Sequence, residues 1–174
     1  MKIIPTILIG IVSMSFGPVT PFNSPNNIPN IRPFDDTPYI ILSDTKRRLQ
    51  PGVITGKFGD PRNHSQGGFG YPHQGIDYKL PKGYTVRASA DGVVEFAGDA
   101  GKYGYGWTVV IDHGNGLKTR YAHLSRQWAN QGDRVLQGQR IGEVGDSGNA
   151  RGYHLHYEIM RNGKQISPSE FIFI

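Results

Sequence analysis

Residues 107–125 read WTVVIDHGNGLKTRYAHLS, and this stretch decides the fold class. Residues 107–112 and 117–123 are rich in the β-branched and aromatic side chains that favour strands. The HGNG segment between them contains Asn-Gly, a pair typical of the tight turn that joins two antiparallel strands. The stretch therefore predicts a β-hairpin.

The segments on either side continue the β pattern. Residues 86–97 (VRASADGVVEFA) predict a second hairpin that turns at Asp91-Gly92, and residues 134–144 repeat a rhythm of turns and short strands. No window has a helical stripe, although residues 124–131 have room for one or two helical turns. We expect a mainly β fold of antiparallel sheets with little helix, in one domain over residues 51–174.

Residues 154–160 (HLHYEIM) alternate between two kinds of side chain. In a strand, Leu155, Tyr157 and Ile159 share one face, and that face is apolar. The other face carries His154, His156 and Glu158. The apolar face predicts a strand that is anchored in a core, with two imidazoles on its opposite side.

The first 50 residues differ from the rest. Residues 1–16 begin with Lys2 and continue without charge, which predicts a signal peptide, because the apolar run is shorter than the roughly 20 residues of a membrane span. An uncleaved anchor and a buried segment are the alternatives. Residues 17–50 start with a Pro- and Asn-rich stretch that predicts a linker or N-terminal extension. We expect an exported protein without stable membrane insertion once the signal is removed.

Composition excludes several classes. The chain has no cysteine, which rules out disulfides, a cysteine nucleophile and a thiolate metal site. The net charge of +5 favours attraction to polyanionic polymers. No nucleic-acid-binding motif is present, and the longest basic run is Lys46-Arg47-Arg48, so nucleic acid is not an expected partner.

Two groups among the six histidines suggest metal chemistry. The first is HQGID over residues 73–77, and the second is HLH over residues 154–156. A straight strand would separate His73 from Asp77 by about 13 Å, so the chain must bend, and Pro72 and Gly75 are where it can. Two histidines and one carboxylate form a common ligand set of a catalytic zinc. Taken singly, each group is explained better as ordinary surface or loop residues, and only the combination favours a metal site.

A hydrolytic metal site also needs a base for the attacking water. The sequence contains no HExxH, so the glutamate of that motif is missing. A histidine that does not bind the metal can do the same work, since its pKa lies near neutrality. His123 and the spare member of the HLH pair are the candidates.

The motifs HQGID (73–77), YAHLS (121–125) and HLHYE (154–158), in this order, resemble those of the lysostaphin-type zinc endopeptidases. The resemblance runs from about Gly56 to the C-terminus. It implies peptidoglycan peptides as substrate, one Zn²⁺ per chain, and a β-sheet groove with loops around the zinc site. We expect a monomer in the periplasm, cell envelope or extracellular space.

The resemblance also implies roles for individual residues. His73, Asp77 and His156 would be the zinc ligands, while His123 and His154 would be the unliganded catalytic pair. How the base and oxyanion-binding roles divide between these two stays open. The chain departs from the family at residues 149–153 (NARGY), just before the HLH pair, which puts substrate preference in doubt.

Other residues are weaker candidates. Glu158 is equally compatible with accepting a hydrogen bond from an imidazole and with an ordinary solvated carboxylate. We expect His113 to be a turn residue and His64 and Arg62 to be structural. Three aromatic residues suit a groove wall as well as a loop anchor: Phe69, Tyr71 and Tyr103.

Other functions fit the sequence less well. A catalytically silent peptidoglycan-binding or activator module is the main alternative, and it would be marked by lost ligands, which are all present here. The rhythm of residues 90–98 and 132–145 resembles a biotinyl or lipoyl carrier, but no lysine stands at the required turn. Residues 17–50 are candidates for a segment that covers the groove, with a plain spacer as the alternative. Which peptide bond is cut does not follow from the sequence.

Overall fold

The computed structural model describes residues 53–61 and 71–168. The predicted signal peptide (1–16) and linker (17–50) lie outside the described residues, as do Arg62, His64 and Phe69. Across the part of the chain that is described, no helix has both the length and the apolar character needed to cross a bilayer.

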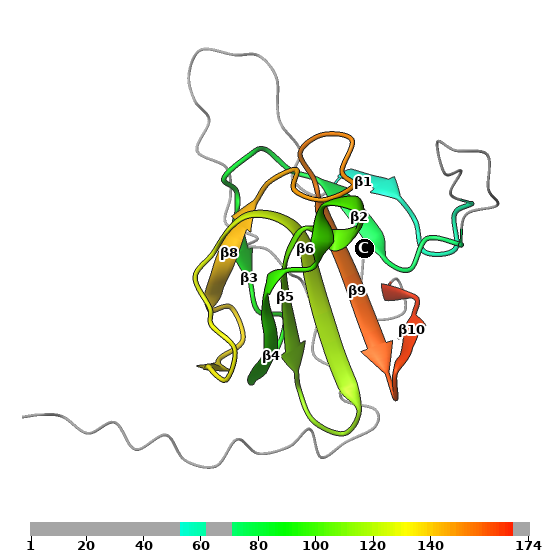
Figure 1. Cartoon of the computed structure of the whole chain (residues 1–174). Coiled ribbons are helices and arrows are strands. Elements are labelled where there is room, and N and C mark those ends of the chain that lie inside the picture. The colour runs from blue at the N-terminus through cyan, green and yellow to red at the C-terminus, as the bar shows by residue number, and fades with distance from the viewer. Residues whose placement is uncertain (1–52, 62–70, 169–174) are drawn as a thin grey trace, which may run out of the picture.

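About half of the described residues lie in one antiparallel sheet of ten strands (Figure 1). The prediction of a mainly β, antiparallel fold is confirmed. A short π-helical turn, η1 (Gly101–Tyr105), interrupts the strands between β4 and β5. The strands are β1 (Val53–Gly56), β2 (Ile76–Lys79), β3 (Thr85–Arg87), β4 (Gly92–Asp99), β5 (Trp107–Asp112), β6 (Leu117–Gln127), β7 (Arg134–Val135), β8 (Arg140–Val144), β9 (Leu155–Arg161) and β10 (Lys164–Ile166).

Strand β9 lies at the centre of the part of the sheet that carries the histidines. One of its edges pairs with β6, and the other pairs first with β2 and then with β10 (Figure 1). The register sets His156 opposite Asp77 of β2 and opposite Ala122 of β6. Three segments that are far apart in sequence therefore meet at His156.

The alternation predicted for β9 is confirmed. Leu155, Tyr157 and Ile159 are fully buried and belong to the hydrophobic core. Burying one such side chain stabilises a fold by roughly 1.5–3 kcal/mol. The hydroxyl of Tyr157 donates to Ser89 Oγ (2.9 Å), and so does the hydroxyl of Tyr121 (2.9 Å), which keeps these polar atoms satisfied inside the core. The opposite face of β9 is therefore held rigidly.

The hairpin predicted for residues 107–123 is also confirmed. β5 and β6 pair along their length, and Gly114, Asn115 and Gly116 of the turn all have positive φ. Glycine and asparagine adopt this conformation at the least cost, which explains the HGNG sequence. His113 is buried, with its Nδ1 2.7 Å from Asp91 O and its Nε2 2.7 Å from Thr119 Oγ1, so it holds the turn to the core.

Two expectations about local structure are wrong. β3 and β4 do not pair with each other, because β3 pairs with β8 and β4 pairs with β5 and β7. Neither Asp91 nor Gly92 has the positive φ of a two-residue hairpin turn. Glycine is needed at 92 for another reason: a Cβ there would lie 2.5 Å from Asp112 O. Residues 124–127 form the end of β6 and not a helical turn.

Candidate metal centre

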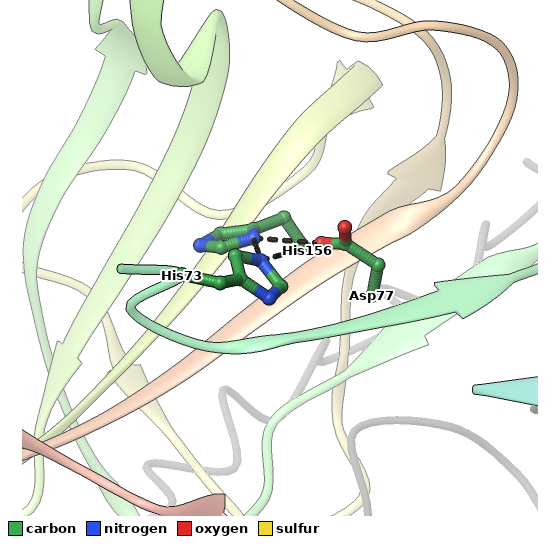
Figure 2. Close-up of side chains that lie close together, drawn as sticks. All are labelled: His73, Asp77 and His156. Carbon is green, nitrogen blue, oxygen red and sulfur yellow. Dashed lines mark hydrogen bonds and ion pairs between the residues drawn. The ribbon is translucent and has the colours of Figure 1, made fainter. Parts of the chain in front are cut away.

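Three buried side chains converge on one point (Figure 2). His156 Nδ1 lies 2.8 Å from Asp77 Oδ1 and 3.0 Å from His73 Nε2, and His73 Nε2 lies 3.1 Å from Asp77 Oδ1. Each residue is at most 7% exposed. These are the three residues that the family resemblance implied as ligands.

The local sequence explains how His73 and Asp77 reach the same point. His73 precedes β2, Asp77 lies within β2, and the chain bends at Gly75 between them, as expected. A Cβ at position 75 would lie 2.3 Å from the carbonyl oxygen of Tyr157, so only glycine allows this bend to pack against β9. His156 then enters from β9 through the register that sets it opposite Asp77.

The second nitrogen of each imidazole fixes its tautomer. His73 Nδ1 lies 2.8 Å from the carbonyl oxygen of Lys57, and His156 Nε2 lies 3.0 Å from Glu158 Oε1. Both partners only accept hydrogen bonds, so these nitrogens are the protonated ones. His73 Nε2 and His156 Nδ1 therefore present lone pairs toward each other and toward the Asp77 carboxylate. In neutral rings, three electron-pair donors thus face one another, and either a proton or a metal ion between them would relieve their repulsion.

The electrostatics of the cluster also favour positive charge. Burial would raise the pKa of Asp77, but the hydrogen bonds with His156 and His73 outweigh burial and hold it well below its usual range. Burial lowers the pKa of His156, yet Asp77 and Glu158 on its two sides raise it further, and the net shift is upward. A carboxylate that stays ionised and an imidazole that attracts a cation suit a metal site.

The donor set and its spacing fit a divalent metal. In a tetrahedral zinc site, donors about 2.05 Å from the ion are separated by roughly 3.3 Å. The three separations here are slightly shorter, at 2.8, 3.0 and 3.1 Å. Nitrogen and oxygen donors without thiolate match a catalytic site with an open position more closely than a closed structural one.

His123 and His154 stand beside this cluster. Their ring centroids are 4.7 Å apart, and His154 Nε2 lies 3.8 Å from Asp77 Oδ1. His123 Nδ1 is 2.7 Å from Ser147 O, and His154 Nδ1 is 2.8 Å from Gly152 O, so each ring donates a hydrogen bond from Nδ1. Burial, followed by the charge of His154, lowers the pKa of His123 to about 4, which keeps it neutral near pH 7.

A strained backbone conformation aims His123 at the cluster. His123 has a φ of 60°, which is unusual for a non-glycine residue and costs on the order of 1–3 kcal/mol. The registers of β6 with β5 and with β8 both shift close to this position. Such a bulge re-aims a side chain that would otherwise follow the alternation of the strand. Local strain at this residue is typical of a functional position.

Comparison with known proteins assigns the chain to a family. The family profile described as Peptidase family M23 matches residues 71–168, which is more than half of the 174 residues. This chain belongs to Peptidase family M23.

The relatives of this chain include two proteins named as endopeptidases, one of them for peptidoglycan. The chain is 52% identical over 96 residues to "DD-carboxypeptidase/endopeptidase Mpg" of Neisseria meningitidis serogroup B, covering 55% of this chain and 22% of that protein. It is 43% identical over 99 residues to "Peptidoglycan DD-endopeptidase ShyA" of Vibrio cholerae, with the same two coverages of 55% and 22%. The chain thus spans about a fifth of the length of these curated relatives.

Solved structures agree with the M23 assignment. The catalytic domain of the antimicrobial peptidase lysostaphin from Staphylococcus simulans matches with a TM-score of 0.61 and 28% identity, covering 69% of this chain and 91% of that one. A zinc-containing peptidase from Vibrio cholerae matches with a TM-score of 0.65 and 30% identity, covering 79% of this chain and 38% of that one. The resemblance inferred from the three motifs is confirmed.

Behind His156, the M23 domain has a buried polar network that the sequence indicated only in part. Glu158 is fully buried and accepts hydrogen bonds from His156 Nε2 (3.0 Å), Arg120 Nη1 (2.8 Å) and the Tyr105 hydroxyl (2.6 Å). The Arg120 guanidinium also stacks over the Tyr105 ring at 4.2 Å. Of the two interpretations of Glu158, the structure supports the hydrogen-bond acceptor. Arg120 and Tyr105 belong to no recognisable motif, so sequence reasoning missed them.

A groove of about 860 Å³ opens over the histidine and aspartate cluster. Tyr71 lines it, whereas Tyr103 does not appear among its lining residues. The divergent segment 149–153 contributes Asn149, Arg151, Gly152 and Tyr153, so the departure from the family pattern does form part of the groove wall. His113 lies apart from the groove in the core.

Proposed function

We propose that this chain is a zinc metalloendopeptidase that hydrolyses peptide cross-links of peptidoglycan outside the cytoplasm. The observation that carries the proposal is the convergence of three buried donor atoms, His73 Nε2, Asp77 Oδ1 and His156 Nδ1, in one groove. Membership of an M23 peptidase family and relatives named as peptidoglycan DD-endopeptidases support the substrate. The predicted leader over residues 1–16 would supply the export that such a substrate requires.

In this proposal, His73, Asp77 and His156 hold the zinc. Zinc, when bound, polarises the peptide carbonyl and lowers the pKa of a water molecule. His123 and His154 both line the groove and donate from Nδ1, so Nε2 of a neutral ring is available to take up the proton of the attacking water. The same proton then passes to the departing amine nitrogen, which leaves as a neutral group. The carbonyl groups of Ser147 and Gly152 keep both rings oriented for this transfer.

Metal content and wall digestion of the full chain test the proposal together. We expect one zinc per chain by elemental analysis and release of soluble peptides from purified peptidoglycan. A chelator should abolish the release, and added zinc should restore it. His156→Ala should lose both zinc and activity, whereas Lys102→Ala, at an exposed position outside the groove lining, should keep both.

The alternative, a catalytically silent peptidoglycan-binding or activator module, predicts a different result. In that case the wild-type chain would sediment with peptidoglycan but release no peptide at any zinc concentration. Wild type and His156→Ala would then behave alike. Such an outcome would end the enzyme proposal.

A further inference from the structure

The pairing of β2 with β9 places a lysine beside the catalytic candidates. Asp77 lies opposite His156, and one step further along the same register Tyr78 lies opposite Leu155. Lys79 is the next residue along β2, and His154 immediately precedes β9. Because side chains two residues apart in a strand share a face, Lys79 projects from the face that carries Asp77. Lys79 and His154 both line the groove over the metal cluster.

The groove is lined by a second basic residue, Arg151, in addition to Lys79, and by little negative charge. Lys79 and Arg151 both line it, and both are exposed. Asp77 is the one carboxylate among the described lining residues, and it belongs to the metal cluster. The structure gives neither Lys79 nor Arg151 an ion pair with a described residue. Counting described residues alone, this groove therefore offers two cations without an ion-pair partner to whatever binds in it.

The position of these cations relates them to the scissile bond. Lys79 lies two residues beyond Asp77, or about 6.6 Å along the strand. One Cα–Cα step in a substrate is about 3.8 Å, and the long, flexible side chain of lysine can span the remaining distance to a group on the substrate residue beside the metal. Ammonium and guanidinium groups bind carboxylates through charge-assisted hydrogen bonds, and arginine can do so with two at once.

We propose that Lys79, together with Arg151, binds a free carboxylate on the substrate residue next to the scissile bond. The inference rests on the proposed function and narrows its substrate. In a cross-link that joins D-alanine to the amine of a diamino dicarboxylic acid, the acylated amine stands beside a free carboxylate. A glycine bridge has no such group within its chain. The groove is therefore built for the first class of cross-link.

Arg151 adds a feature particular to this chain. It lies in the NARGY segment, residues 149–153, where the sequence departs from the pattern usual in its family. That segment is a wall of the groove and continues directly into His154. Residues 149–153 thus bring a cation and no anion to this wall, which suits a negatively charged substrate.

Two synthetic cross-linked peptide dimers test the proposal with the zinc-loaded full chain. Both contain a bond between D-alanine and the D-centre amine of meso-diaminopimelate, and in one of them the carboxylate beside that amine is converted to an amide. We expect wild type to cut the carboxylate dimer with a kcat/KM about tenfold higher than the amide dimer, mainly through KM, since a hydrogen bond to a charged group has about this effect.

Variants identify the residues responsible. Lys79→Ala should bring the ratio of the two kcat/KM values to within about twofold of one, with Arg151→Ala lowering it less. Lys79→Arg should retain most of the preference. Lys164→Ala removes the same charge from an exposed position on β10, outside the groove, and should keep the wild-type ratio. Melting temperatures check that each variant is folded, and the ratio is unaffected by a mere loss of active protein.

The outcomes separate the two proposals. If wild type cuts both dimers equally, or if the Lys79→Ala, Arg151→Ala double variant keeps the wild-type preference, the carboxylate site is refuted while the peptidase stands. If wild type cuts neither dimer and releases nothing from intact peptidoglycan, the proposed function fails and the carboxylate site fails with it.

Discussion

Replacing Glu158 by Gln tests how the metal cluster is held. The Glu158 carboxylate accepts three hydrogen bonds, from His156 Nε2, Arg120 Nη1 and the Tyr105 hydroxyl. A glutamine of the same shape keeps one acceptor oxygen and replaces the other by an NH₂ group, which cannot accept from any of these donors. At least one donor therefore loses its partner, and the negative charge that favours a cation at His156 is lost.

The expected effect on zinc binding is large. Removing a group that orients a metal-bound histidine through its second nitrogen lowers metal affinity by about 10–100-fold. The fold should lose stability as well, because breaking a buried ion pair costs about 3–5 kcal/mol. The Arg120 side chain is 22% exposed and keeps some contact with water, so we expect a smaller loss of about 2 kcal/mol.

Competition with a chromophoric chelator measures the zinc dissociation constant, and urea unfolding of the metal-free chain measures stability separately. Glu95→Gln is the matched control, because Glu95 pairs with Lys118 at 2.6 Å but is 46% exposed. It should leave zinc affinity unchanged. Tyr105→Phe removes one donor and no charge, so it should weaken zinc binding by only a few-fold.

A Glu158→Gln chain that is folded and binds zinc as tightly as wild type would refute this reasoning. The hydrogen bond to His156 would then have no part in positioning the imidazole. Equal losses of affinity in Glu158→Gln and Glu95→Gln would also refute it, since they would indicate a general effect of net charge.

Three further predictions concern other parts of the domain. His123→Gln and His154→Gln should each lower kcat by about 10²–10⁴-fold while zinc content stays at one per chain, and a loss of zinc in either would mean that the residue is a ligand. Gly75→Ala should cost about 1–3 kcal/mol of unfolding free energy and weaken zinc binding, because its Cβ would lie 2.3 Å from Tyr157 O; unchanged melting and affinity would contradict this. Burial lowers the pKa of His113 in the folded chain. As pH falls, the unfolded chain therefore binds a proton at this residue before the folded chain does. The stabilisation that comes from a neutral His113 is complete above about pH 6.5 and is lost as pH falls below it. His113→Gln should therefore make urea stability less dependent on pH between 5 and 7, and an unchanged slope would argue against a neutral buried His113.

The positions of strands could be predicted from the sequence more reliably than the pairing of one strand with another. Alternation in residues 154–160 and the HGNG turn are local signals, and both predictions are confirmed. The Asp91-Gly92 hairpin is wrong because its glycine serves a different purpose, the close approach of the Asp112 carbonyl. That contact comes from a strand that is distant in sequence, and no local pattern reports it.

In the candidate site, too, the residues within motifs were predicted and those outside motifs were missed. Motif order was sufficient to collect His73, Asp77, His123, His154 and His156, which the structure brings into one groove. Tyr105 and Arg120 escaped notice because nothing in their own sequence context marks them. Their relation to the site exists only through Glu158, and it depends on how β6 and η1 are placed next to β9.

The long-range register of β9 has a consequence for the timing of activity during synthesis. His73 and Asp77 precede His156 by about eighty positions, and the strand that carries His156 is the next to last of the described sheet. Contacts of such separation form late in folding, because the intervening chain must first be ordered. A nascent or truncated chain that ends before residue 154 therefore has two of the three donors and only one of the two unliganded histidines. The proposed zinc site is therefore completed only when β9 has been made, and the activity proposed for it would come last in synthesis.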